Sequence, residues 1–481
     1  MKYVVRIMLA FALALTVTLG RAGHAQAQAA KGAAWQSSIT VLNVDAGPAT
    51  INIDFYPGRG GTPISFQPET KLNAGAGTSY SLSSIAGINA GFKGSAIVYS
   101  DQRLVSTVVQ FVPGGLGGKG VRPLSNGFQA SDASPTYLLP TVLNNEFNTV
   151  TEFSIQNVET TAITATLEFY PAGATAPSLT GQVRIGANEA QPLDASTVGI
   201  PAKFNGSATI KAIKTSDNTP ANIVVTVSEY NTTNSNASSV EAAKAGANTY
   251  YMPIALCNLS GPGTATSSYA IQNADTVSAA VTVRFYGLDR SLKKQIGPFT
   301  VQPGAKTSIN GCTDAGLGDG FNGSAVIGSE TGKIVAVGKV GGAGISSAFL
   351  GSETGAQVLA LPYVRWSPDA QFQVGARQRT FIAIQNLSND PADVVVSYRN
   401  KDGVEVAKKT YRVLNAGGKV NSNPFEAGAA PNGYFGEENG VFGGGAIITA
   451  PAGVKITAVA RVVSGIGPIA TGEDYNAIPI Q

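Results

Sequence analysis

One pattern recurs four times along this chain: an alternating apolar run that ends in asparagine, a polar turn, and a second alternating run that ends near an aromatic residue. The four copies are SITVLN…INIDFY from Ser38, FSIQN…TLEFY from Phe153, SYAIQN…VTVRFY from Ser268 and FIAIQN…VVVSYR from Phe381. The aromatics Phe55, Phe169, Phe285 and Tyr398 follow each other at nearly equal intervals. The chain is therefore a tandem array of four units.

The side chains of these runs alternate with the period of a β-strand. In the third unit Val281, Val283 and Phe285 alternate with Thr282 and Arg284. A period of two buries one face of a strand and leaves the other in water, and β-branched and aromatic residues favour strands. The asparagines that end the first runs are interpreted as turn formers, with a binding role as the alternative. They are Asn43, Asn157, Asn273 and Asn386.

The N-terminal segment 1–27 is predicted to be a secretory signal peptide. Lys2 and Arg6 precede a short apolar run, and Ala25-Gln26-Ala27 fits a cleavage site of small residues, with Ala27-Gln28-Ala29 as a second choice. The run is too short to span a bilayer, and no later segment has 18 unbroken apolar residues. We therefore expect a secreted protein, extracellular or on the cell surface, with no transmembrane segment in the mature chain.

Removal of the signal peptide changes the charge balance and excludes several kinds of chemistry. Residues 1–27 hold three basic and no acidic residues, so 30 basic and 30 acidic residues remain. A neutral chain lacks the basic footprint of a nucleic-acid binder. The single histidine, His24, is removed as well, which excludes Ser-His-Asp and Cys-His catalysis and most zinc sites. We expect no enzyme activity, no catalytic or metal-binding residues and no cofactor.

The four units are expected to be separate domains after the signal peptide. Their predicted ranges are 28–133, 134–247, 248–356 and 357–481. A second signature recurs in each: Phe92-Lys-Gly-Ser-Ala, Phe204-Asn-Gly-Ser-Ala, Phe321-Asn-Gly-Ser-Ala and Phe442-Gly-Gly-Gly-Ala. Its shared glycine predicts a tight turn or a bulge that leads into a strand.

A short strand that ends near proline also recurs, as TYLLP at 136–140, TYYMP at 249–253, VLALP at 358–362 and YNAIP at 475–479. Proline places such a strand at an edge or at a strand end. About seven strands per unit, with no helical period, are typical of an antiparallel sandwich. The predicted fold is all-β: four tandem antiparallel immunoglobulin-like β-sandwich domains in an elongated array.

The order LP…IQN…V-x-F-Y…F-x-G-S-A…I-V-A-V resembles tandem immunoglobulin-like or fibronectin-III-like repeats. More narrowly, it is similar to the domain-sized repeats in secreted and cell-surface proteins of filamentous bacteria. The resemblance covers nearly all of 35–481 and implies an extracellular protein of surface layers, filaments or adhesion. It transfers no catalytic residue. Unit one departs from the pattern because no LP strand precedes it, and unit four has Phe442-Gly-Gly-Gly-Ala and a longer insertion around 421–441.

Two pairs of residues in unit three suggest local chemistry. Cys257 and Cys312 are the only cysteines, and an even pair in an exported chain favours a disulfide. Asp314 and Asp319 lie in the glycine-rich segment CTDAGLGDGFNG. Calcium needs six to eight oxygen ligands and the EF-hand spacing is missing, so a solvated loop is the favoured interpretation and a calcium site the alternative.

Three tyrosines are candidate interaction residues. Tyr56, Tyr170 and Tyr286 each follow a buried aromatic, so alternation points them outward, and Arg399 takes this place in unit four. An outward row of tyrosines can meet sugar or a neighbouring protomer. The favoured alternative is that they pack under a loop.

The ends of the chain leave two alternatives. Either each LP strand closes the unit before it and the chain is self-contained, or each opens the unit after it. In the second case unit one lacks a strand, and the C-terminal residues Tyr475, Ile478, Pro479 and Ile480 can fill that gap in the next molecule and build a filament. Residues 28–36 are a further candidate for the missing strand, although AAKGAAW has little β character.

Two classes of function follow. The first is a non-catalytic secreted structural or adhesive cell-surface protein, which self-assembles head-to-tail if its C-terminal strand is donated. The second is a carbohydrate-binding or enzyme-accessory extracellular protein. The expected partners are other copies of the chain, other cell-surface components or polysaccharide, and not nucleic acid.

Overall fold

The computed structural model describes residues 28–58, 61–342, 344–374, 377–415, 417–438, 441–465 and 470–480. These residues form antiparallel β-strands, with one short helix, α1 (Asp369–Val374), and two 3-10 turns, η1 (Leu82–Ser84) and η2 (Ala130–Asp132). The prediction of an all-β fold of antiparallel sandwiches is confirmed. The predicted signal peptide and His24 lie outside the described residues. No described helix has the length and apolar character needed to cross a bilayer.

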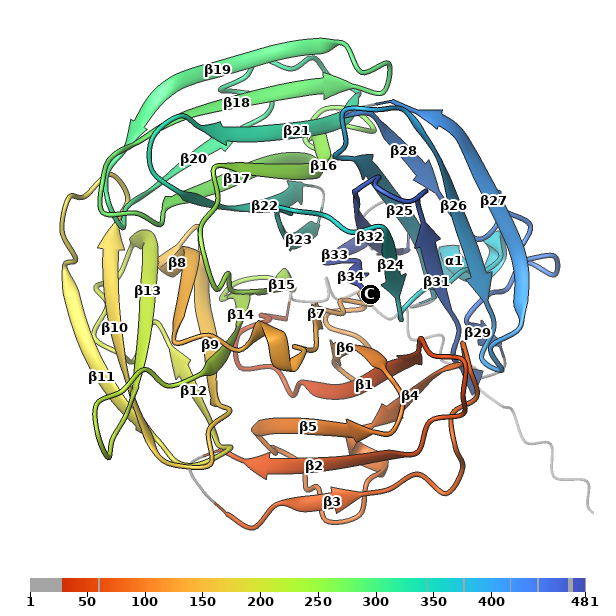
Figure 1. Cartoon of the computed structure of the whole chain (residues 1–481), viewed down its shortest axis with the longest axis horizontal. Helices are drawn as coiled ribbons and strands as arrows, with labels where there is room; N and C mark the ends of the chain where they lie inside the picture. Colours follow the sequence, from red (N-terminus) through yellow and green to blue (C-terminus); the bar gives the residue numbers. More distant parts are fainter. Residues whose placement is uncertain are drawn as a thin grey trace, which may run out of the picture.

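Each unit has an inner sheet that carries the first run of the repeat, beside the axis of the molecule (Figure 1). The inner strands, in the order in which they neighbour each other, are β4 (Gly77–Ser81), β1 (Gln36–Asn43), β6 (Leu104–Phe111) and β7 (Leu124–Asn126) in unit one; β12 (Ala190–Asp194), β9 (Thr149–Asn157), β14 (Ile223–Asn231) and β15 (Ala237–Glu241) in unit two; β20 (Lys306–Asn310), β17 (Thr266–Asn273), β22 (Ile334–Gly342) and β23 (Ile345–Leu350) in unit three; and β28 (Lys419–Ser422), β25 (Gln378–Asn386), β32 (Ile456–Ser464) and β33 (Thr471–Asn476) in unit four.

An outer sheet carries the second run and packs on the inner one. Its strands are β3 (Ile64–Phe66), β2 (Ile51–Pro57) and β5 (Gly94–Ser100) in unit one; β11 (Leu179–Ile185), β10 (Ile163–Pro171), β13 (Phe204–Lys214) and β8 (Thr136–Glu146) in unit two; β19 (Leu292–Val301), β18 (Ala279–Gly287), β21 (Phe321–Ser329) and β16 (Thr249–Cys257) in unit three; and β27 (Glu405–Leu414), β26 (Ala392–Arg399), β31 (Gly445–Thr449), β24 (Val358–Leu361) and β34 (Ile478–Pro479) in unit four.

All pairings between these strands stay within one unit. In unit two β8 also pairs with β9, so the two sheets are continuous there. Unit four adds a small hairpin, β29 (Glu437–Glu438) with β30 (Val441–Phe442). The predicted boundaries at 133, 247 and 356 fall in the connections between β7 and β8, β15 and β16, and β23 and β24.

The repeated asparagine is buried and joins two segments of its unit. In unit three the side-chain amide of Asn273 donates to Val277 O and to Val301 O, both at 2.8 Å, while its Oδ1 accepts from Asp275 N at 2.8 Å. The other three asparagines make equivalent bonds to the residue four positions on and to a carbonyl 28 or 29 positions on. The residue is a turn former, as predicted, and it also ties that turn to the connection that follows the outer edge strand.

The glycine of the second signature is required by a close approach of two strands. An added Cβ at Gly94, Gly206 or Gly323 would lie 2.0–2.1 Å from the carbonyl oxygen of the next-to-last residue of the neighbouring strand, a tyrosine in each case. These oxygens belong to Tyr56, Tyr170 and Tyr286. The glycine therefore lets β5, β13 or β21 start close to the neighbouring strand β2, β10 or β18. It does not serve a tight turn, but the predicted bulge is present in units two and three, where the pairing with β8 and β16 shifts register beside Gly206 and Gly323.

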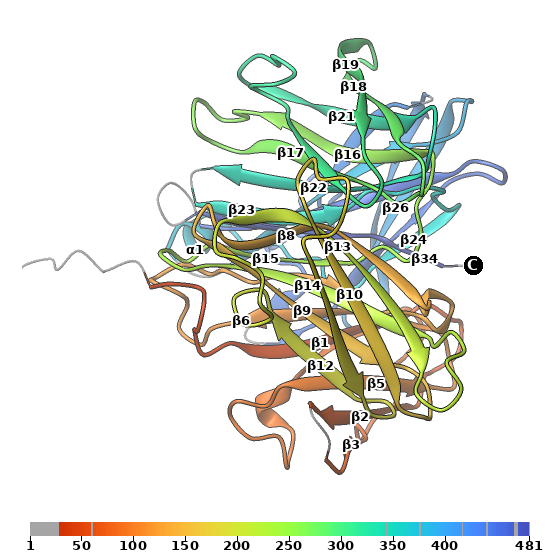
Figure 2. The ribbon, with the colours of Figure 1, turned by 90° about the vertical axis from the view of Figure 1, so that its left-hand side faces the viewer.

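The four units form a closed ring, and the expected elongated array is wrong (Figures 1 and 2). Units one and four are at opposite ends of the sequence, yet Asn126 Nδ2 donates to Asn476 O at 2.8 Å. Leu42 and Val105 of unit one pack with Ala360 and Ile478 of unit four. Each unit packs on the next in a similar way, and a repeated head-to-tail contact closes into a ring when its rotation divides a full turn.

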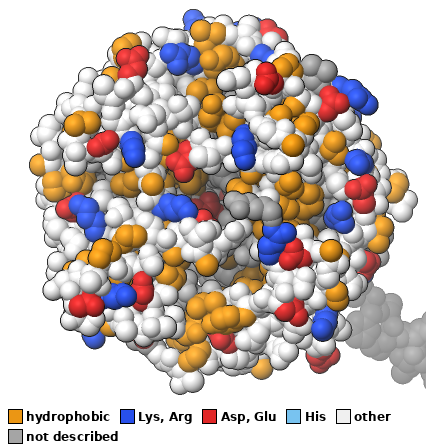
Figure 3. All heavy atoms as spheres, viewed as in Figure 1, with side chains coloured by type: hydrophobic (Ala, Val, Ile, Leu, Met, Phe, Trp, Pro, Cys, Tyr) orange, Lys and Arg blue, Asp and Glu red, His pale blue; other side chains and the backbone are white. Residues whose placement is uncertain are grey.

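Polar side chains link the units at the ring axis, where the last inner strands β7, β15, β23 and β33 lie side by side. One layer of equivalent residues joins all four units. Asn126 N donates to Glu241 Oε1, and Asn476 exchanges two hydrogen bonds with the backbone of Leu350, at 2.7 and 3.0 Å. Burial raises the pKa of the Glu241 carboxyl. Figure 3 shows acidic and basic side chains around a central hollow on one face of the ring.

Candidate functional site

Unit one differs from the other three units in its outer sheet, beside β5. In units two, three and four the equivalent strands β13, β21 and β31 each have two neighbours, and one neighbour is the first strand of the unit: β8, β16 or β24. β8 and β16 contain TYLLP and TYYMP, and β24 is the VLAL of VLALP. Among the described residues β5 pairs with β2 alone. The LP strand therefore opens the unit that follows it, and the part of unit one that the structure describes has no such strand.

The missing strand leaves part of the unit-one core uncovered. Ala96 and Val98 of β5 are partly exposed. Their equivalents in the other units are 0% exposed: Ala208, Ala325 and Ala446 for Ala96, and Ile210, Ile327 and Ile448 for Val98. The side chains face the same core in every unit, so the difference in exposure comes from the first strand.

The segment that follows the last inner strand forms the other side of this gap, and in unit one it lacks a paired strand as well. In units two to four, the residue that lies two positions after the last inner strand forms a bridge to the first strand of the unit. The pairs are Ala243 with Leu138, Ser352 with Tyr251, and Ile478 with Ala360. Phe128 holds this position in unit one, and no strand of unit one lies beside it within the described ranges. The gap is thus open to hydrogen bonding from two sides.

One large groove fills this place between units one and two, and residues 354–358 and 478–480, at the edge of unit four, line it as well. Its cavity volume is about 2530 Å³, and its walls include Ala96, Val98, Ser106 and Gly127 from unit one and Ser154 and Thr226 from unit two. Small-molecule sites are usually ~300–1,000 Å³. The groove therefore suits a polypeptide segment better than a small ligand. We call it the unit-one slot.

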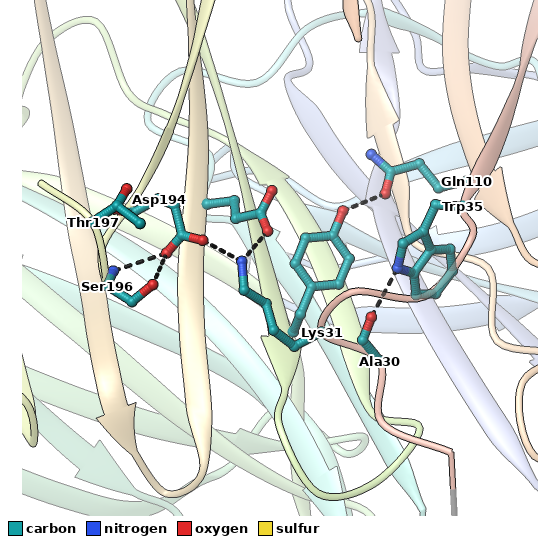
Figure 4. Close-up of polar contacts among 9 residues, drawn as sticks. Ala30, Lys31, Trp35, Gln110, Asp194, Ser196 and Thr197 are labelled. Atoms are coloured by element: carbon teal, nitrogen blue, oxygen red, sulfur yellow. Dashed lines mark hydrogen bonds and ion pairs between the residues drawn. The ribbon is translucent and has the colours of Figure 1, made fainter. Parts of the chain in front are cut away.

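Residues 28–36 do not replace the missing strand, because unit two holds them at one end of the slot. Ala30 N donates to Asn234 O at 2.8 Å, and Lys31 N to Asn231 O at 2.9 Å. The Lys31 ammonium binds the carboxylates of Glu152 and Asp194 (Figure 4).

An aromatic pair lies next to this ion cluster. The Trp35 ring packs on Tyr230 with a centroid distance of 5.5 Å, and its Nε1 donates to Ala30 O at 3.0 Å. Tyr230 Oη in turn donates to Gln110 Oε1 at 2.7 Å. These contacts join the N-terminal segment to both unit one and unit two.

The ion cluster has a defined charge state. Partial burial by itself would lower the pKa of Lys31, but its hydrogen bonds to Asp194 and Glu152 outweigh burial and raise that pKa. Burial opposes ionisation of Asp194 too, and the hydrogen bonds from Lys31 and Ser196 lower the pKa of its carboxyl. Lys31 and Asp194 are therefore both charged at neutral pH. The sequence carries no local signal for this cluster, because Lys31 lies 121 and 163 positions from its partners.

The C-terminal candidates Tyr475, Ile478, Pro479 and Ile480 are engaged within their own chain. Tyr475 is buried, and its Oη donates to Tyr363 O at 2.6 Å. Ile478 and Pro479 pair with β24, and Ile480 N donates to Val358 O at 3.0 Å. YNAIP is therefore not a fourth LP strand. It is equivalent to VEAAK at 240–244 in unit two, which lies at the end of the last inner strand. Its apolar residues and its proline resemble the LP pattern only in sequence.

The candidate tyrosines Tyr56, Tyr170 and Tyr286 are all partly buried. Tyr170 lies at the interface with unit three, where its ring would be 2.6 Å from a Cβ added to Gly304. Arg399 has the equivalent place between unit four and unit one, with its Nη1 2.7 Å from a Cβ added to Gly75. For Tyr170, the structure supports packing under a loop, and the loop belongs to the next unit.

Cys257 and Cys312 form a disulfide within unit three, as the sequence predicts. The two acidic residues of the neighbouring loop are used by that loop: Asp314 Oδ2 accepts from Asn310 N, and Asp319 Oδ1 from Asn258 Nδ2, both at 2.7 Å. In the described part of the chain, no three His, Cys, Asp or Glu side chains are grouped so that they could hold a metal ion.

Comparisons with known proteins add little to this picture. No protein-family model matches the chain, and no curated protein matches it. One solved structure, the crystal structure of Thermotoga maritima 1070, is similar over 23% of this chain and 94% of its own chain, with 14% identity and a TM-score of 0.19. A TM-score this low supports no conclusion about fold or function.

Proposed function

We propose that this chain is a non-catalytic secreted structural or adhesive protein of the cell surface, which holds another polypeptide by strand addition in the unit-one slot. The unit-one slot carries the proposal. Addition of a strand to an open sheet edge provides main-chain hydrogen bonds and side-chain pockets together. An open apolar edge is a liability unless something covers it.

Donation of the C-terminal strand to a next molecule is not part of this proposal. Residues Tyr475–Ile480 complete unit four and the contact with unit one, so their release would uncover two surfaces of the donor. Gln129 Nε2 of unit one, for example, donates to Pro479 O at 3.4 Å.

The proposal is tested by the distribution of the protein between the cell surface and the medium in the organism that produces it. Thr226→Arg places a long charged side chain in the slot from the unit-two wall and leaves the core of unit one unchanged. Thr164→Arg, on the outer face of β10 in the same unit, is the matched control. We expect wild type and Thr164→Arg on the surface and Thr226→Arg mainly in the medium. Equal distributions of all three proteins would contradict the proposal.

Carbohydrate binding is a second candidate, favoured by an exposed aromatic stack in unit four. Phe425 is 59% exposed, and its ring stacks on Trp366 at a centroid distance of 5.7 Å and an interplanar angle of 11°. The Arg379 guanidinium lies 4.8 Å from the centre of the same Trp366 ring. An exposed ring on a rigid support presents a flat apolar face with low entropy cost. Retention of wild type on polysaccharide resins, lost in Phe425→Ala, would support this function.

A further inference from the structure

We infer that the occupant of the unit-one slot is an extended strand from a different polypeptide, with the apolar alternation of the LP strands, and that it pairs antiparallel to β5. This inference deepens the proposed function and rests on it. In units two, three and four the equivalent place is filled by β8, β16 and β24. These three strands indicate what kind of strand the unit-one slot accepts.

Unit two provides the register. There Tyr137 lies opposite Ile210, Leu138 opposite Thr209, and Leu139 opposite Ala208, with a bulge after Leu139. The equivalents of these three β13 residues on β5 are Val98, Ile97 and Ala96. An incoming strand in the same register therefore places one apolar side chain opposite Val98 and the next-but-one opposite Ala96, where the unit-one core is uncovered.

The two faces of the incoming strand meet different surroundings. In unit two, Tyr137 and Leu139 are buried in the core of their own unit, whereas Leu138 packs into the core cluster of unit three. The strand is thus covered on both faces. In the unit-one slot, the second face meets a wall of unit two that has both polar and apolar side chains, among them Ser154, Thr226 and Val224. The occupant should therefore have apolar residues toward unit one, and it can have either polar or apolar residues toward unit two.

A second copy of this chain is not the expected source. Its three LP strands are already paired with β13, β21 and β31, and its C-terminal strand is paired with β24 and β32. Residues 28–36 are held by unit two. No described segment of the chain is left to donate without breaking a sandwich, so the strand comes from another protein.

A synthetic peptide with the sequence of residues 136–144, TYLLPTVLN, tests the inference on protein 28–481. Binding is followed by fluorescence anisotropy of the labelled peptide. The control peptide carries the equivalents of Tyr137→Asp and Leu139→Asp. We expect saturable binding to wild type and to Thr164→Arg, and at least tenfold weaker binding of the control peptide and of Thr226→Arg. No binding to wild type, or equal binding to Thr226→Arg, would overturn the inference.

The register is tested by disulfide cross-linking, since the chain has no cysteine outside the Cys257–Cys312 pair. A peptide with the equivalent of Leu138→Cys should cross-link to Ile97→Cys, because directly opposed residues have Cβ atoms ~4.5–5.5 Å apart. It should cross-link at least tenfold less to Tyr99→Cys, two residues away. Equal yields at both positions would show that the peptide is not held in this register.

Light scattering and the surface assay separate the remaining outcomes. If wild-type protein 28–481 dimerises and Thr226→Arg does not, the occupant is a second copy, and the inference is wrong. If the peptide fails to bind but Thr226→Arg still leaves the cell surface, the proposed function stands and the inference fails. If the peptide binds and the surface distribution does not change, the inference stands and the proposed function fails.

Discussion

At the scale of single residues, the repeated buried asparagine has a structural role in every unit. Its side-chain amide donates to two backbone carbonyl groups, one of them buried, and a buried carbonyl group is costly to leave unpaired. Asn273 is 0% exposed, like its three equivalents. This explains why the same residue type stands at the same place in units whose other polar positions differ.

We expect Asn273→Ala to lower the free energy of unfolding by about 1–3 kcal/mol, because the buried carbonyl oxygen of Val301 loses its donor, as does the partly buried carbonyl oxygen of Val277. Urea unfolding of the variant and of the exposed control Asn89→Ala measures the difference. A loss below about 0.5 kcal/mol, the lower end of what one hydrogen bond contributes, would mean that water replaces the amide.

Two buried lysines at equivalent positions make stability depend on pH. Lys306 and Lys419 each lie opposite a glutamine of the inner sheet, Gln272 and Gln385. Lys419 Nζ donates to Asn322 Oδ1 and Gly323 O of the preceding unit, both at 2.9 Å. Burial lowers the pKa of each ammonium group from 10.5 to about 7.

Because the unfolded chain binds more protons than the folded one between pH 7 and 10.5, these lysines make stability rise with pH in that window. Each of the two lysines raises the free energy of unfolding by at most about 1.4 kcal/mol per pH unit. We expect the slope of unfolding free energy between pH 7 and 9 to be smaller in Lys306→Met, Lys419→Met than in wild type. The exposed pair Lys211→Met, Lys293→Met is the control, and identical slopes in all three proteins would contradict the assignment.

At the scale of elements, position in the chain matters more than local sequence for the strands that end near proline. TYLLP, TYYMP and VLALP open their units and pair with the β5-type strand, whereas YNAIP closes unit four. Strand propensity depends on what a strand packs against, so segments of similar sequence need not have the same position in a sheet.

The disulfide joins two elements of unit three: Cys257 ends β16, and Cys312 lies two residues after β20. Titration of unfolded, unreduced exported protein should find no free thiol. The double variant Cys257→Ser, Cys312→Ser should lose about 4 kcal/mol of stability, from the chain entropy of a loop of this length. Two reactive thiols in the exported protein would refute the first expectation, and unchanged stability would refute the second.

At the scale of the whole molecule, a closed ring replaces the string of domains that a tandem repeat suggests. The ring depends on contacts such as Ser347 Oγ with Asp474 Oδ2 at 2.7 Å and Lys339 Nζ with Glu229 Oε1 at 2.6 Å, each between neighbouring units at the axis. Because unit four also contacts unit one, the two terminal units have no free side surface of the kind that ends an open array.

Solution scattering of protein 28–481 checks the closed arrangement. A compact chain of this length should have a radius of gyration of about 22 Å. Four sandwiches in a line would give a much larger value and a rod-like profile, and either result would contradict the ring.

Local period and spacing were enough to predict the strand content, the four-unit repeat, the asparagine turns and the cysteine pair. The same patterns showed that no LP strand precedes unit one. Three-dimensional packing was needed to establish that the units close into a ring, that YNAIP belongs to unit four, and that the gap in unit one is an open slot. The physical reason is separation along the chain: Asn126 and Asn476 are 350 positions apart, and the rotation between units that brings them together is set by packing at each interface and leaves no periodic trace in the sequence.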